Sequence, residues 1–299
     1  MCGIVGLFLK DKALQPRLGE LLATMLVTLS DRGPDSAGIA IYGKGGGKTK
    51  VTLQSGTPEA DFGSLHADLA AAGIGATVTI RSTHAVVETG GDIAGVRAFL
   101  AARRPNVRLM GSGDNIEIYK EVGLPEDVVT RFGIRAMAGT HGIGHTRMAT
   151  ESAVTTLGAH PFSTGADQCL VHNGSLSNHN NVRRELIREG IGFETDNDSE
   201  VAAAYLTAAM AKGKNLRDAL SGALEDLDGF FTFVVGTKTG FGVLRDPIAC
   251  KPAVMAETDQ YVAFGSEYRA LAGLPGIEKA RVWEPEPATV YFWDHKKAA

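Results

Sequence analysis

Cys2 is the first residue of the sequence whose type and position could support chemistry. Removal of Met1, which the small side chain of cysteine favours, would make Cys2 the amino-terminal residue. A free α-amine has a reference pKa of about 7.7–8.0, so much of it is neutral near pH 7 and can take the proton of the neighbouring thiol. The position predicts a nucleophile that carries its own general base. The alternative is a small apolar side chain at the start of a strand.

Histidine and cysteine spacing could also indicate a metal site, but the spacing is incomplete. His141 and His145 are four residues apart without the glutamate of an HExxH site, in a segment that we expect to be a strand. Cys169 and His172 have no second pair at a zinc-site spacing. We therefore expect no metal on this chain, and we expect His145 and His172 to be buried in strands.

Composition and charge narrow the class of protein. Of 299 residues, 44% are hydrophobic and 21% charged, which excludes a disordered or fibrous chain. The formal net charge of −4 implies no broad basic surface, so nucleic acid is not an expected partner. No apolar stretch approaches the roughly 20 residues that span a bilayer, so no membrane contact is expected. Three distant cysteines argue against disulfides, so we expect a cytoplasmic protein in which Cys169 and Cys250 are buried thiols.

The elements that would position these residues alternate between strands and helices. Buried strands are predicted at 3–8 and 37–42, with an amphipathic helix at 17–30 between them. Later strands are predicted at 142–148, 169–174, 230–237, 241–246 and 261–266, and later helices at 178–189, 198–211 and 215–226. Strands dominate both ends of the chain and helices group between them. This order indicates an α+β layered fold and not a doubly wound one.

The segment after the second strand has a pattern of its own. Its predicted elements are strands at 48–53, 76–82, 84–89 and 107–111, a helix at 57–72 that Thr57 would cap, and a helix at 92–103 that Asp92 would cap. The order β-α-β-β-α-β is that of a ferredoxin-like unit. We expect residues 45–135 to form an inserted α/β subdomain within a discontinuous domain of residues 1–44 and 136–299.

Six short motifs occur in a fixed order along the chain. They are MCGIVG (1–6), DRGPDSAG (31–38), GHTRMAT (144–150), AHPF (159–162), HNGSLSN (172–178) and NDSEVAAAYL (197–206). Together they resemble the class II glutamine amidotransferases, which are N-terminal-nucleophile hydrolases. A late segment, 243–267, is similar to the end of that domain. The resemblance covers roughly 1–43 and 140–270, and it implies a four-layer αββα sandwich.

The resemblance implies a role for one or more residues of most motifs. Cys2 would be the nucleophile, and Asn173 and Gly174 would donate to the tetrahedral oxyanion through a side-chain amide and a backbone N–H. Arg147 would bind the α-carboxylate of glutamine with its planar fork of donors. Asp198 would pair with the α-ammonium. The two ends of a zwitterion would thus meet opposite charges.

Two further residues receive roles from the resemblance. Thr150 would line the same pocket, and Arg32, which we group with the substrate-binding residues, would support Cys2. The sequence departs from the family at Met148, where tryptophan is common, and at Glu151, where one branch has histidine.

Each of these residues also has a simpler interpretation. Asn173 and Gly174 are typical of a type I′ hairpin turn. Arg147 could be a surface cation, and Asp198 could cap the helix that follows it.

One branch of the family resembles this chain in longer stretches. Residues 111–125 and 144–165 are similar to the stand-alone amidotransferase subunits of glutamate-synthase-type complexes, among them N-methylglutamate synthase. Residues 271–299 are too few for a synthase domain, so we expect the acceptor chemistry to lie on another polypeptide or not to occur. The resemblance implies no cofactor on this chain and a partner subunit that carries FMN and an iron–sulfur cluster.

The expected function is hydrolysis of L-glutamine through a Cys2 thioester, with ammonia delivered to that partner synthase subunit. One alternative is a non-catalytic regulatory or assembly subunit that keeps the amidotransferase fold. Another is a freestanding amide hydrolase with a different small substrate. The inserted subdomain would either dock the partner or sense a small molecule.

Overall fold

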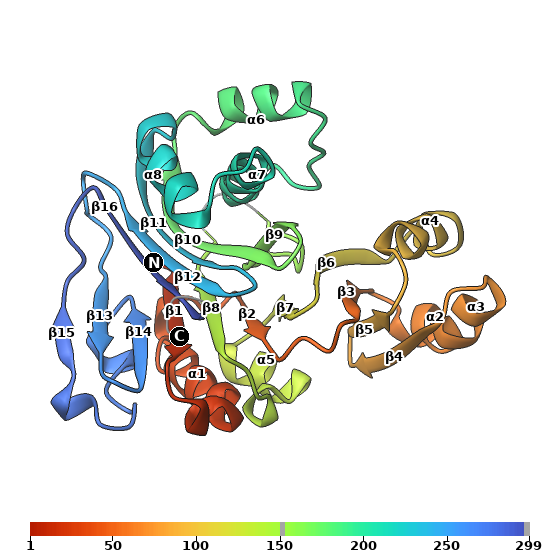
Figure 1. Cartoon of the computed structure of the whole chain (residues 1–299), viewed down its shortest axis with the longest axis horizontal. Coiled ribbons are helices and arrows are strands. Elements are labelled where there is room, and N and C mark those ends of the chain that lie inside the picture. The colour runs from red at the N-terminus through yellow and green to blue at the C-terminus, as the bar shows by residue number, and fades with distance from the viewer. Residues whose placement is uncertain (150–152, 296–299) are drawn as a thin grey trace.

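Two β-sheets stacked face to face form the body of the molecule, and a smaller module projects from one side (Figure 1). The fold comes from a computed structural model, and the structure describes residues 1–149 and 153–295. Within these ranges no helix has both the length and the apolar character that a membrane crossing requires.

The first sheet has seven strands in the order β15-β13-β14-β1-β8-β2-β7, and all neighbours are antiparallel. Its strands are β1 (Gly3–Leu9), β2 (Ser36–Tyr42), β7 (Ile116–Val122), β8 (His141–Arg147), β13 (Val254–Glu257), β14 (Tyr261–Gly265) and β15 (Arg281–Trp283). β1 pairs with β14 on one side and β8 on the other, and it is buried along its whole length. The strand that begins one residue after Cys2 is therefore an inner strand.

The second sheet has five strands in the order β16-β12-β11-β10-β9. Its strands are β9 (Phe162–Gly165), β10 (Gln168–Leu176), β11 (Gly229–Gly236), β12 (Gly240–Arg245) and β16 (Thr289–Asp294). β16 pairs with β12 over six residue positions. The domain therefore continues beyond residue 270, where the family motifs end.

Alternation along β1 divides its side chains between two layers, as the pleat of a strand requires. Ile4 and Phe8 pack in the core between the sheets, together with Phe241 of β12. The other apolar side chains of β1 face the helix α1 (Leu18–Val27). A Cβ on Gly6 would lie 2.7 Å from the Phe241 ring, so the two sheets approach closely at this glycine.

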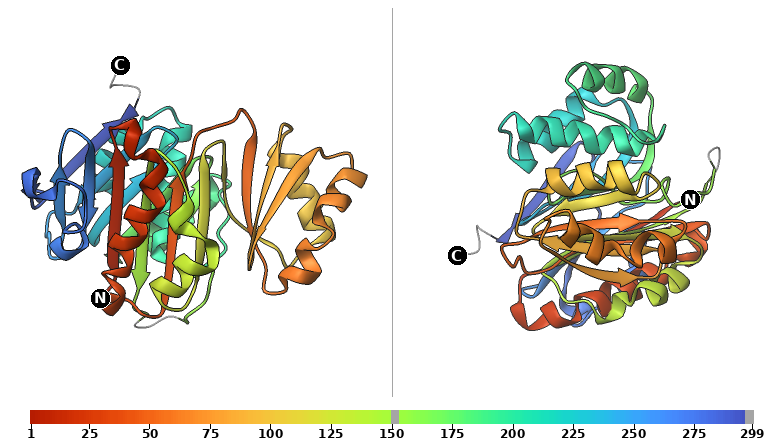
Figure 2. Two further views of the ribbon diagram at one scale, coloured as in Figure 1. Left: turned by 90° about the horizontal axis from the view of Figure 1, so that it is seen from below. Right: turned by 90° about the vertical axis from the view of Figure 1, so that its right-hand side faces the viewer.

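Helices cover the outer faces of both sheets. α1 and α5 (Pro125–Phe132) pack on the first sheet. α7 (Asp198–Ala211) and α8 (Leu216–Asp226) pack on the second sheet, and α6 (His179–Arg188) packs against α7. The predicted α+β class and the αββα layering are confirmed (Figures 1 and 2). The predicted helix 17–30 is shorter, because 3₁₀ turns at Lys12–Arg17 and Ser30–Arg32 flank α1.

The projecting module is a four-stranded antiparallel sheet with helices on one face (Figure 2). Its elements are β3 (Thr49–Gln54), α2 (Pro58–Phe62), α3 (Leu65–Ala71), β4 (Ala76–Arg81), β5 (His84–Thr89), α4 (Ile93–Arg103) and β6 (Arg108–Gly113). The strand order β4-β5-β3-β6 is that of a ferredoxin-like unit, as predicted. The module has its own hydrophobic core, which includes Val51, Phe62, Leu69 and Leu100.

The insertion is shorter than the predicted 45–135. β7 pairs with β2 along its whole length, and α5 packs against α1, so both elements belong to the first domain. The four-stranded unit ends at Gly113. The predicted helix at 57–72 is also two helices, α2 and α3.

The two predicted caps of the module have different outcomes. Asp92 accepts the backbone N–H of Ala94 at 3.0 Å, so this cap is confirmed. Thr57 occupies the predicted N-cap position before Pro58, but its side chain makes no capping hydrogen bond. The hydroxyl of Ser55 instead accepts the Thr57 N–H at 2.9 Å, before the helix begins.

Excision of the module tests whether the sheets fold without it. A Cβ on Gly45 would lie 3.8 Å from the Cβ of Asp114, so joining these residues would close a short hairpin between β2 and β7. We expect the variant lacking 46–113 to unfold in one cooperative transition at a lower temperature, because it loses the packing of His84 on Phe132. Calorimetry and near-ultraviolet circular dichroism provide the measurement. A broad, non-cooperative transition would contradict the prediction.

Candidate active site

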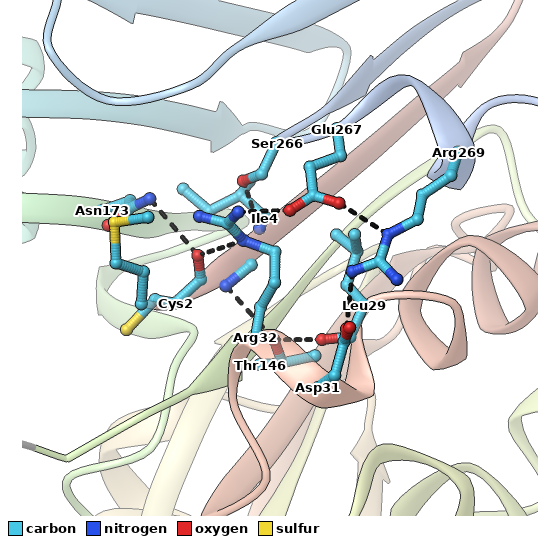
Figure 3. A network of polar contacts seen from close by, with 12 residues as sticks. Cys2, Ile4, Leu29, Asp31, Arg32, Thr146, Asn173, Ser266, Glu267 and Arg269 are labelled. Carbon is cyan, nitrogen blue, oxygen red and sulfur yellow. Dashed lines mark hydrogen bonds and ion pairs between the residues drawn. The ribbon is translucent and has the colours of Figure 1, made fainter.

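The backbone carbonyl of Cys2 is held from two sides at the start of β1. Arg32 donates to it through Nε at 3.0 Å, and Asn173 donates through Nδ2 at 3.4 Å (Figure 3). The next residue, Gly3, donates its N–H to the Thr146 hydroxyl at 3.2 Å. The thiol is partly exposed, and its sulfur lies 3.9 Å from the Met148 carbonyl oxygen. The position of Cys2 is thus fixed through its backbone while its sulfur stays accessible.

Arg32 is itself held by a chain of charges behind Cys2. Its guanidinium forms an ion pair with Glu267, and this hydrogen bond lowers the pKa of the Glu267 carboxyl. Glu267 also binds Arg269 at 2.6 Å, and Arg269 binds Asp31 at 2.6 Å (Figure 3). Arg32 is not among the described residues that line the adjacent cavity. It supports Cys2, as expected, but its grouping with the substrate-binding residues needs correction.

A cavity of about 640 Å³ opens beside Cys2 and brings most of the predicted site together. Its described lining includes Cys2, Arg147, Asn173, Gly174 and Asp198, which come from β8, β10, the start of α7 and the N-terminus. Thr150, the other predicted pocket residue, lies outside the described residues.

Asn173 and Gly174 lie inside β10 and not in a hairpin turn. They pair with Thr232 and Phe231 of β11, so the type I′ turn is wrong. Gly174 has φ of +148°, and a Cβ there would lie 1.9 Å from the Phe230 carbonyl oxygen. Only glycine fits at this position, where the strand passes the cavity.

Arg147 is the last residue of β8 and is only 5% exposed, so it is not a surface cation. Its Nη1 donates to the Ala153 carbonyl at 3.2 Å. A buried guanidinium that lines a cavity presents a fixed fork of donors, which suits a carboxylate.

Asp198 begins α7 but does not cap it. The cap is Asn197, whose side chain accepts the Ser199 N–H at 2.8 Å, so the predicted cap is wrong by one residue. Asp198 accepts the Leu176 N–H at 2.9 Å and lies 3.6 Å from His172 Nδ1. Burial acts to raise the pKa of Asp198, but these contacts outweigh burial and lower its pKa to about 2. The carboxylate is therefore ionised at neutral pH and partly open to the cavity.

Three buried histidines stand behind Asp198. His172 Nδ1 and His160 Nε2 both lie 2.9 Å from the Ser199 hydroxyl, and His145 stacks on His160 at 4.0 Å. Burial lowers the pKa of His145 to about 3 and that of His160 well below its usual value. The predicted burial of His145 and His172 is confirmed, but His172 and His160 also line the cavity. Strand periodicity indicates burial and cannot show which buried side chain faces a cavity.

Sequence reasoning missed two residues that shape the site. Asp35, in the segment 31–38, accepts the Ala149 N–H at 2.7 Å and holds the chain just after β8. Lys251 lines the cavity with its ammonium 5.0 Å from the Phe230 ring centre. Both fall within segments that resemble the family, which is the only signal that could have indicated them.

The other cysteines differ from each other. Cys169 is buried beside the Tyr42 hydroxyl at 3.3 Å, and burial raises the pKa of its thiol to about 12. Cys250 is exposed, so its predicted burial is wrong, because it lies in the loop between β12 and β13 and not in a strand. In the described ranges, no three His, Cys, Asp or Glu side chains group closely enough to hold a metal ion.

Comparison with known proteins agrees with the fold. Residues 145–273 match the family model of a glutamine amidotransferase domain. A glutamine amidotransferase-like protein, GlxB, from Rhizobium meliloti is 76% identical over the full length of both chains. A relative from Methanothermobacter thermautotrophicus with glutamine amidotransferase in its name is 32% identical over 97% of this chain and 99% of its own.

A solved structure shows the same fold. The glutamine phosphoribosylpyrophosphate amidotransferase from B. subtilis superposes with a TM-score of 0.63 at 19% identity, over 99% of this chain and 48% of that chain. This chain therefore spans about half of that protein. The chain belongs to the class II glutamine amidotransferase family.

Replacement of Asp198 by asparagine tests the charge of this carboxylate. Because its pKa is lowered in the folded state, the carboxylate stabilises the fold above about pH 4, and this contribution is lost as the pH falls toward 2. Asp198→Asn should lower the free energy of unfolding by about 2 kcal/mol near pH 6 and by progressively less between pH 4 and pH 3. Urea unfolding at each pH gives the measurement. Asp196→Asn, an exposed neighbour, should show no such dependence.

Proposed function

We propose that this chain hydrolyses the side-chain amide of L-glutamine through a thioester on Cys2. The observation that carries the proposal is the cavity, where a thiol, a buried arginine and an ionised aspartate line one space. Arg147 and Asp198 carry opposite charges, as the two ends of a free amino acid require. An amide substrate without the zwitterionic end would use neither residue.

The proposed reaction begins once Met1 has been removed. With Met1 in place, the nitrogen of Cys2 is an amide and has no basic lone pair. The freed α-amine takes the thiol proton, and the sulfur attacks the amide carbon of the glutamine side chain. Asn173 Nδ2 and the Gly174 N–H stabilise the negative oxygen of the tetrahedral intermediate, a contribution of about 3 kcal/mol for each donor.

Collapse of this intermediate breaks the C–N bond. The nitrogen leaves as ammonia with the proton that the α-ammonium returns. Water then attacks the thioester carbon, the C–S bond breaks, and L-glutamate and the free thiol are released. Arg32 keeps Cys2 in place through both steps because it binds the Cys2 carbonyl and not the sulfur.

We further propose that the ammonia passes to a separate synthase subunit. The support is the resemblance of residues 111–125 and 144–165 to the amidotransferase subunits of glutamate synthase and N-methylglutamate synthase-type complexes. In such an assembly the partner subunit would hold FMN and an iron–sulfur cluster, and this chain would supply the nitrogen. Co-purification from the native host identifies the partner. Recovery of the chain alone under mild conditions would contradict this part of the proposal.

Replacement of Cys2 by alanine should abolish glutamine hydrolysis, because no other described side chain of the cavity is a thiol. Glutamate release by the full-length chain, with its co-purified partner where one is found, gives the measurement. Cys250→Ala is the matched control, since Cys250 is exposed and outside the cavity lining, and it should keep full activity. Unchanged activity of Cys2→Ala would overturn the thioester mechanism.

The mass of the intact protein separates the proposal from a non-catalytic subunit. We expect the chain purified from its native host to lack Met1, because the mechanism needs the free α-amine of Cys2. Intact-mass spectrometry measures this directly. A chain that fully retains Met1 would instead favour the regulatory or assembly role.

A further inference from the structure

One wall of the glutamine cavity is a segment without regular secondary structure. Residues 153–161 lead directly into β9, and four of them line the cavity: Ala153, Thr155, Gly158 and His160. We call residues 153–161 the cavity wall. A segment with no ladder of backbone hydrogen bonds needs other contacts to hold its shape.

Lys120, on the edge strand β7, supplies such contacts from behind the cavity wall. Its ammonium donates to the carbonyls of Leu157 at 3.2 Å, Ala159 at 2.8 Å and Pro161 at 3.3 Å. It also lies 4.6 Å from the centre of the Phe162 ring. One side chain thus binds three carbonyls within five residues, which uses all three donors of an ammonium.

The charge of Lys120 is costly to bury and is nevertheless retained. The residue is 4% exposed, and burial lowers its pKa to about 8, while the carboxylates of Glu200 and Glu194 act in the opposite direction. The ammonium is therefore still mostly protonated at pH 7. Without the carbonyl partners, burying the charged ammonium would cost far more free energy.

The cavity wall packs on the first sheet directly above Gly38 of β2. A Cβ on Gly38 would lie 2.1 Å from the His160 carbonyl oxygen and 2.5 Å from the Lys120 Cβ. The absence of a side chain at Gly38 lets the wall approach the sheet closely enough for Lys120 to reach it. The neighbouring Glu121 adds another contact, since its carboxylate accepts the hydroxyl of Thr156.

The cavity wall in turn touches the residue that would bind the α-carboxylate. Arg147 Nη1 donates to the Ala153 carbonyl at 3.2 Å, and a Cβ on Gly158 would lie 3.7 Å from the same nitrogen. Movement of the wall would therefore displace a hydrogen-bond partner of the Arg147 guanidinium.

We infer that Lys120 is a positioning residue for glutamine recognition: its three hydrogen bonds to the cavity wall keep Arg147 aligned for the α-carboxylate. The inference rests on the proposed function. Lys120 does not touch the substrate or Cys2, so its loss affects recognition of the amino-acid end of glutamine and leaves the thiol as reactive as before.

Labelling of Cys2 by two electrophiles tests this separation in the full-length chain. A diazoketone analogue of L-glutamine carries the α-amine and α-carboxylate, whereas iodoacetamide carries neither. The second-order rate of labelling at Cys2 is measured for each reagent by mass spectrometry in a Cys250→Ala background, since exposed Cys250 would also react. The ratio of the two rates reports recognition of the amino-acid end and needs no partner subunit.

Lys120→Met removes all three donors at similar length and should lower this ratio at least tenfold, with the iodoacetamide rate within twofold of the parent. Lys120→Gln keeps an N–H donor, so its rate ratio should lie between those of the parent and Lys120→Met. If Lys120→Met does not fold, the ratio of Lys120→Gln decides the question. Lys50→Met is the matched control, because Lys50 binds Glu117 of the same strand at 2.6 Å and not the cavity wall. Its ratio should stay unchanged.

The possible failures are distinguishable. An unchanged ratio in the Lys120 variants, or an equal fall in both rates, would overturn the positioning role. The proposed function fails in a different way. It would be contradicted if the parent chain, with Met1 removed, reacted no faster with the diazoketone than Lys120→Met and Asp198→Asn do.

Discussion

The structure depends on the burial of β1 as an inner strand between two layers. β1 is paired on both edges, faces α1 on one side and meets the second sheet at Gly6 on the other. A chain terminus is ordinarily the least ordered part of a domain. Here Cys2 directly precedes a strand that is fixed in the core, and Arg32 and Asn173 hold the Cys2 carbonyl in place. A reactive group at the end of a chain can thus be held as firmly as one inside a helix.

Electrostatics divide the cavity into charged and neutral parts. Asp198 stays ionised because its hydrogen-bond partners lower its pKa, whereas burial keeps His145 and His160 neutral. Neutral rings can fill the space behind Asp198 without competing with a substrate ammonium for its charge.

Local sequence patterns predicted most of the layers, and the family motifs predicted that Cys2, Arg147, Asn173, Gly174 and Asp198 meet in one site. What they missed depends on long-range pairing. β7 has a strand-like sequence, but its place in the first sheet follows from pairing with β2 across the whole insertion. Lys120 looks like an ordinary solvent-facing lysine in sequence, because the carbonyls that bind it belong to a segment without a periodic pattern.

The place of the insertion has a consequence for the rate of folding. Tyr42 and Ile116 face each other across β2 and β7, although residues 43–115 separate them in sequence. Closing a loop of roughly 70 residues costs about 2 kcal/mol more in chain entropy than closing one of about five. When the ferredoxin-like unit folds first, Gly45 and Asp114 are already neighbours, and the remaining loop is short. Early folding of the insertion therefore lowers the entropic barrier to adding the last strand of the larger sheet.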